Sequence, residues 1–133
     1  MKQIFSFFSV LCLVVGVQAS PKMEFGHYIG VDSESGVLEA DLVLSSNYTL
    51  VLKLKSPDFE VPEPGCTGSY IELGNELLSQ VSCPLDFLPT AALRLDIAKV
   101  NASTVRSADG AEVLVYVDAL GQDPIPFKMK IVE

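Results

Sequence analysis

Apolar residues recur at every second position over several stretches of this chain, and no other feature constrains its fold as strongly. Within 37–44 and again within 48–55, leucines occupy alternate positions with charged residues between them. This period of two is typical of half-buried antiparallel strands. The polar turn Ser45-Ser46-Asn47 between the two runs predicts that they form a β-hairpin.

The second half of the chain repeats the pattern. Residues 91–98 and 125–132 alternate apolar with polar side chains, and 112–117 form a more continuous apolar run. Turn signals at Asp109-Gly110 and at 121–124 separate these segments. Short strands at this spacing predict an all-β chain in which two antiparallel sheets pack as a sandwich.

The middle of the chain departs from this alternation. Residues 56–65 carry three prolines and predict an extended crossing segment. Between Cys66 and Cys83, apolar residues have the spacing of one helix face, and Pro84 would end such a helix. We therefore expect a short helix, or a loop excursion, between the two cysteines.

The N-terminus predicts export. Lys2 precedes an almost unbroken apolar run from Ile4 to Val17, and Val17-Gln18-Ala19 places small residues at the two positions that signal peptidase reads. We predict a signal peptide over 1–19 and a single domain over 20–133, secreted or retained in a lumenal compartment of the secretory pathway. A retained anchor helix is the alternative. Because the run is short for a bilayer and no later stretch is longer, no stable membrane span is expected.

Loss of the leader also removes Cys12 and leaves one pair of cysteines, Cys66 and Cys83. In an oxidising compartment a single pair permits one intramolecular disulfide, and two free thiols are the alternative. Asn47-Tyr48-Thr49 and Asn101-Ala102-Ser103 match the acceptor pattern for N-glycosylation. The sequence thus predicts a secreted glycoprotein with one disulfide bond.

Charge and motifs exclude several classes of function. Without Lys2 the chain has eight basic and 17 acidic residues, a net charge of −9, which argues against nucleic acid and anionic membranes as partners. The one histidine, His27, has no zinc-helix motif around it, and neither a nucleophile elbow nor a phosphate loop is present. The acidic groups at 32–34 and 58–63 lack calcium-loop spacing. We expect no enzyme activity, no cofactor and no metal.

The order of segments resembles the ML lipid-recognition family, which includes Niemann-Pick type C sterol carriers, ganglioside activator-like proteins and mite group 2 allergens. The residues that carry the resemblance are the proline-bearing segment 56–65 leading to Cys66, then Cys83-Pro84-Leu85, and the closing strand 125–132. The family's early cysteine has no counterpart in 20–36. The resemblance implies an immunoglobulin-like β-sandwich whose sheets enclose a sterol, fatty acyl chain or glycolipid.

Two functions therefore remain open. The first is a carrier that buries an apolar small molecule or lipid, entered near Phe59 and Val61 in the proline-rich segment. Its walls would be the inward-facing apolar residues Leu42, Leu44, Leu50, Leu52, Leu54, Leu93, Leu95, Val115, Phe127, Met129 and Ile131. The second is a module with a solid core that binds an extracellular protein through 56–65 or the 66–83 loop.

Overall fold

The computed structural model describes residues 21–118, 121 and 123–133, and its regular structure is almost entirely β-strand. The predicted leader, 1–19, lies outside the described residues. One short 3₁₀ helix, η1 (Thr104–Arg106), precedes the last two strands. The strands are β1 (Gly26–Asp32), β2 (Glu39–Leu44), β3 (Thr49–Ser56), β4 (Phe59–Glu60), β5 (Cys66–Leu73), β6 (Glu76–Ser82), β7 (Thr90–Asp96), β8 (Ala111–Val117) and β9 (Ile125–Val132).

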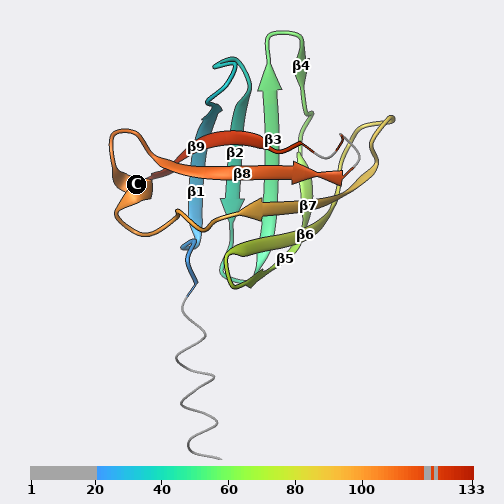
Figure 1. The fold of residues 1–133 in the computed structure, drawn as a ribbon. Coiled ribbons are helices and arrows are strands. Elements are labelled where there is room, and N and C mark those ends of the chain that lie inside the picture. The colour runs from blue at the N-terminus through green and yellow to red at the C-terminus, as the bar shows by residue number, and fades with distance from the viewer. Residues whose placement is uncertain (1–20, 119–120, 122) are drawn as a thin grey trace, which may run out of the picture.

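Eight of these strands close into an antiparallel barrel. With β4 set aside, each strand pairs with the next one along the chain, from β1 to β9. The last strand then returns to the first, in a register that runs from His27↔Val132 to Asp32↔Phe127. β4 extends one end of β3 as a short flap, here called the β4 flap (57–65). Figure 1 shows β1–β3 behind β6–β8, which cross them at a steep angle.

The all-β antiparallel class is confirmed, but the immunoglobulin-like sandwich is wrong. Alternation within each strand fixes which side chains face inward, and a sandwich and a barrel share that pattern. What separates them is whether the outermost strands meet. Here β1 pairs with both β2 and β9, so the main sheet keeps no open edge.

The helix predicted between the two cysteines is also wrong, because that segment is the β5–β6 hairpin. Its strands pair from Thr67↔Ser82 to Leu73↔Glu76, and Gly74, at φ 59°, occupies the tight turn. Leu77 and Val81 face the interior, whereas Ile71 and Leu73 are exposed. The helical spacing arose because apolar side chains lie on both faces of this hairpin.

β1 was not evident from the sequence, since its aliphatic side chains face solvent and a glycine stands at one of its inward positions. Ile29 and Val31 point outward and are exposed, while Tyr28 and Gly30 face the interior. A Cβ atom at Gly30 would lie 2.7 Å from Sδ of Met129 and 2.9 Å from the carbonyl oxygen of Lys128. Glycine is required there because β9 and its methionine side chain approach β1 so closely.

The barrel interior is packed with apolar side chains over most of its length. An eight-stranded barrel is just wide enough for side chains to fill it, or for one small ligand. Loop residues from one end, Met23, Ile97, Val100 and Val105, complete this core and seal that end. The fully buried strand residues include Tyr28, Leu42, Leu44, Leu50, Leu77, Leu95, Phe127 and Met129.

The two ends of the barrel therefore differ. The closed end carries the N-terminal segment 21–25, the turns 45–48 and 74–75, and the 97–110 loop with η1. The open end carries the 33–38 turn, the β4 flap and the 83–89 loop. Cys66 and Cys83 form a disulfide at the open end, as predicted, which ties the start of β5 to the 83–89 loop.

Matched leucine variants test this assignment of inside and outside. Leu42 is fully buried, so Leu42→Ala should lower the free energy of unfolding by about 2–5 kcal/mol. Leu73 is 59% exposed, so Leu73→Ala should change it by less than about 0.5 kcal/mol. Urea unfolding followed by circular dichroism measures both, and equal losses would contradict the barrel register.

Candidate functional site

An apolar cavity of about 250 Å³ lies at the open end of the barrel. Its walls come from the ends of the strands, from the β4 flap and from the 83–89 loop. Every described residue of the wall is apolar or belongs to the disulfide, and none of them has a charged or hydroxyl side chain. The lining residues are Leu52, Leu54, Phe59, Val61, Cys66, Val81, Cys83, Leu85, Phe87, Leu88, Ala91, Leu93 and Val117.

Two aromatic rings stand at the rim of this cavity. Phe59 on the β4 flap and Phe87 on the 83–89 loop pack edge to face, with ring centroids 6.2 Å apart. Phe87 is 71% exposed, a large exposure for an aromatic side chain. The flap is held to the barrel by a hydrogen bond from the amide of Val61 to the carbonyl oxygen of Leu54, 3.0 Å long. The rim thus presents apolar surface both to the cavity and to solvent.

The structure brings some of the predicted wall residues together and separates others. Leu52, Leu54, Leu93 and the predicted entrance residues Phe59 and Val61 all line this cavity. Ile131 packs against the core from a partly buried position. The remaining predicted wall residues fill the solid part of the interior, namely Leu42, Leu44, Leu50, Leu95, Val115, Phe127 and Met129.

Sequence reasoning missed the contribution of the 83–89 loop. Leu85, Phe87 and Leu88 supply much of the cavity wall, although none belongs to a strand. Cys83-Pro84-Leu85-Asp86-Phe87-Leu88-Pro89 places three large apolar residues between two prolines. Because loops are usually polar, such a run is the signal that could have identified this segment as part of a site.

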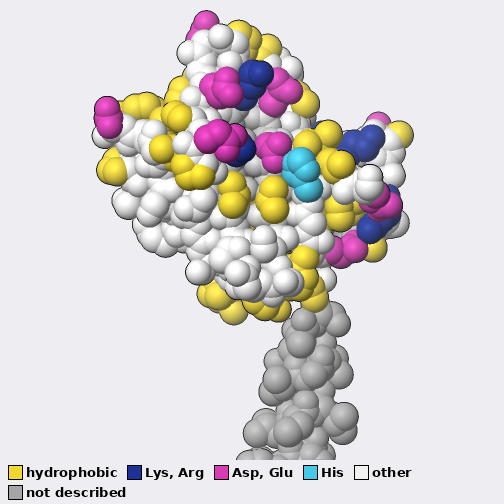
Figure 2. All heavy atoms as spheres, turned by 180° about the vertical axis from the view of Figure 1, so that it is seen from behind, with side chains coloured by type: hydrophobic (Ala, Val, Ile, Leu, Met, Phe, Trp, Pro, Cys, Tyr) yellow, Lys and Arg dark blue, Asp and Glu magenta, His cyan; other side chains and the backbone are white. Residues whose placement is uncertain are grey.

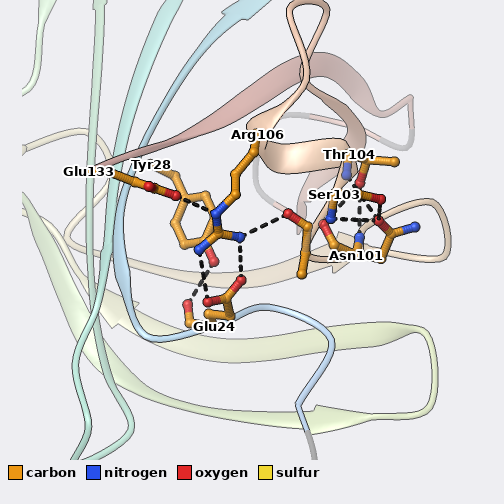
Figure 3. Close-up of polar contacts among 8 residues, drawn as sticks. Glu24, Tyr28, Asn101, Ser103, Thr104, Arg106 and Glu133 are labelled. Carbon is orange, nitrogen blue, oxygen red and sulfur yellow. Dashed lines mark hydrogen bonds and ion pairs between the residues drawn. The ribbon is translucent and has the colours of Figure 1, made fainter.

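The closed end is held by an ion-pair cluster around Arg106, shown in Figure 3. Its guanidinium donates to both carboxylate oxygens of Glu24, at 2.7 and 3.1 Å, and also pairs with Glu133. Beside it the hydroxyl of Tyr28 donates to the carbonyl oxygen of Glu24 at 2.7 Å, and burial raises the pKa of that phenol. The cluster fastens the N-terminal segment to η1 and is a structural seal.

Asn47 and Asn101, the two predicted glycosylation acceptors, also lie at the closed end and are exposed. The Oδ1 atom of Asn101 accepts hydrogen bonds from Ser103 and Thr104 (Figure 3). The Oδ1 atom of Asn47 accepts a hydrogen bond of 2.8 Å from the hydroxyl of Thr49. Tyr48, the neighbour of Asn47, packs against Phe25, and Arg106, in the same loop as Asn101, pairs with Glu24. Because Glu24 and Phe25 are adjacent, Asn47 and Asn101 lie at the same end of the barrel.

His27 and Asp32, two of the polar groups considered for catalysis or metal binding, have structural partners. His27 Nε2 lies 2.7 Å from a carboxylate oxygen of Asp41 on the neighbouring strand. Burial would raise the pKa of Asp32, but hydrogen bonds from the Glu34 amide and the Ser35 hydroxyl lower it below its usual value. Across the described residues, no three His, Cys, Asp or Glu side chains are grouped as metal ligands.

Two shallower depressions lie on the outside of the barrel. The larger, about 700 Å³, crosses the outer face of β5–β8, where Arg94 stacks 3.7 Å above the ring of Tyr116 and pairs with Glu76. The smaller, about 370 Å³, lies over β1–β3 and β9 and is lined by charges of both signs. Figure 2 shows acidic, basic and apolar side chains interspersed on that face. Both depressions are open to solvent.

Comparisons with known proteins add nothing to this geometry. No protein-family model, no curated protein and no solved structure matches the chain. Its relationship to the ML lipid-recognition family therefore stays a prediction. Among the described residues, none of the helices is suited to crossing a membrane.

The Glu24–Arg106 contact predicts how stability changes in acid. The hydrogen bond from Arg106 holds the pKa of Glu24 below its usual value, so this contact stabilises the fold at neutral pH and is lost as the pH falls through that lowered pKa. Glu24→Gln should lower the Tm at pH 7, and the difference from the parent protein should shrink as the pH falls below about 4.3, where glutamate in the unfolded chain takes up its proton.

Thermal unfolding at several pH values measures this difference. Asp109→Asn is the control, because it removes an exposed carboxylate at the same end that is not bonded to Arg106. A Tm difference between Glu24→Gln and the parent that does not shrink as the pH falls would contradict the assignment.

Proposed function

We propose that this protein is a secreted carrier of a small apolar ligand, which it holds in the cavity at the open end of its barrel. The observation that carries the proposal is the cavity wall, whose described residues are all apolar or belong to the disulfide. Ligand sites are typically concave and mostly apolar, and barrel mouths are among the places where they occur. Burial of the ligand's apolar surface would supply the binding free energy, at about 25 cal/mol per Å².

The cavity volume limits the size of the ligand. A cavity of 150 Å³ accepts benzene, so about 250 Å³ suits a chain or ring system of roughly ten carbon atoms. The four fused rings of a sterol, or a whole glycolipid, would exceed it. The proposed ligand is therefore smaller than those implied by the family resemblance.

Paired alanine variants test the proposal. Ala91 lines the cavity, whereas Ala92, the next residue of β7, faces the outer depression on β5–β8. Ala91→Phe should weaken binding of 1-decanol at least tenfold because the new ring occupies the cavity, and Ala92→Phe should leave it unchanged. An NMR titration of the ¹⁵N-labelled protein measures the affinity and shows which amides shift.

The same titration can refute the proposal. The spectra also report whether each variant is folded, and Ala91→Leu provides a smaller filling should phenylalanine disturb the barrel. If 1-decanol shifts no amides around the cavity, or if both alanine variants bind it like the parent, the carrier proposal fails.

A second candidate function is protein recognition through the outer depression on β5–β8. The observation that favours it is the exposure of Ile71 and Leu73 beside that depression, on the hairpin that joins the cysteines. The alanine pair would then exchange roles: Ala92→Phe would abolish capture of the extracellular partner protein, and Ala91→Phe would not.

Secretion has its own support and its own test. A disulfide joins Cys66 to Cys83, and such bonds persist mainly in oxidising compartments. We expect the secreted protein from a eukaryotic host to begin at Ser20 and to lose mass on treatment with an N-glycosidase. N-terminal sequencing and mass spectrometry measure both, and an intact Met1 in the culture medium would contradict cleavage after Ala19.

A further inference from the structure

The rim of the cavity carries negative charges on the same segments that carry its apolar walls. Asp58 precedes the wall residue Phe59, and Asp86 lies between the wall residues Leu85 and Phe87. Both acidic side chains are exposed, and neither makes a hydrogen bond or an ion pair within the described part of the chain. Two further acids are close by along the chain but lie on the outer side of the rim, Glu60 and Asp118.

Positive charges are directed away from this rim. None of the lysines and arginines in the described ranges lines the cavity. The nearest in sequence, Lys53 and Lys55, alternate with the wall residues Leu52 and Leu54 and line the outer depression instead. Lys53 is further engaged by an ion pair with Glu63. An anionic head at the rim would therefore find no cationic side chain among the described residues of the cavity wall.

The two aromatic rings at the rim favour the opposite charge. The faces of Phe rings attract an ammonium group that comes within about 6 Å of the ring centre. Phe87 is largely exposed, and Phe59 packs edge to face against it. A cation seated above the cavity would be close to these rings, which stand on the same segments as the exposed Asp58 and Asp86.

Resting on the carrier function proposed above, we infer that the cavity selects amphiphiles with a cationic, ammonium-type head and an apolar tail of about ten carbon atoms. The tail fills the apolar cavity and the head stays at the rim. Fatty acids of the same length are disfavoured, because their carboxylate finds no side-chain donor among the described wall residues and two like charges on the rim segments.

The size of the preference follows from screened electrostatics. We evaluate the effect for a head group that lies about one Debye length, about 8 Å, from each carboxylate. At that distance each carboxylate changes the affinity of a unit charge by a factor of about 1.4. Two carboxylates strengthen binding of a cationic head and weaken binding of an anionic head, so the two affinities differ about fourfold. Contact of the cation with the aromatic rings adds to this difference.

The test compares three probes that share one tail: decylamine, 1-decanol and decanoate. Calorimetry at pH 7 and 0.15 M salt, below the micelle concentration of each probe, should give affinities in that order, with decylamine about fivefold or more tighter than decanoate. In Asp86→Lys the amine-to-acid ratio should fall about fourfold, towards one. The matched control is Asp109→Lys, an exposed acid of the closed end, which should leave the ratio unchanged.

The outcomes separate this inference from the carrier function. If decanoate binds as tightly as decylamine, the head-group preference is overturned while the cavity keeps its carrier role. If none of the three probes binds, both proposals fail. If Asp109→Lys alters the ratio as much as Asp86→Lys does, the preference reflects net charge and not the rim, and the assignment to Asp58 and Asp86 is overturned.

Discussion

Backbone pairing between β1 and β9 is the constraint on which the rest of this structure depends. It joins the first strand to the last, so a sheet that would otherwise expose two edges becomes a continuous wall. Closure also fixes the interior width, because eight strands leave room for little more than their own side chains. Everything inside the barrel is arranged within that width, including the close packing of Met129 against Gly30.

The interior is solid at one end and hollow at the other because the loops differ. At the closed end, short apolar residues from the 97–110 loop and Met23 enter the barrel, and the Arg106 cluster holds these segments in place. At the open end the 83–89 loop and the β4 flap lean over the strands without filling the space beneath them. The cavity therefore exists because these loops leave space above the strands, while the strands form its wall.

Much of the fold could be predicted from alternation, as the hairpin of β2 and β3 and the strand β9 show. The closure of the barrel could not, since no local pattern records that the first and last strands meet. Gly30 and the outward-facing Ile29 and Val31 concealed β1. For the site, strand periodicity correctly set Leu52, Leu54 and Leu93 inward, but it could not say which inward residues face a void. That depends on loop side chains such as Leu88, whose position is set by tertiary structure alone.

The position of the two predicted glycosylation acceptors has a consequence for access to the cavity. Asn47 and Asn101 both project from the closed pole, opposite the mouth. A sugar chain on either one would extend away from the cavity, so it would leave the route between solvent and the interior unobstructed. Such a chain would shield the closed end from neighbouring macromolecules and leave the cavity end exposed to them.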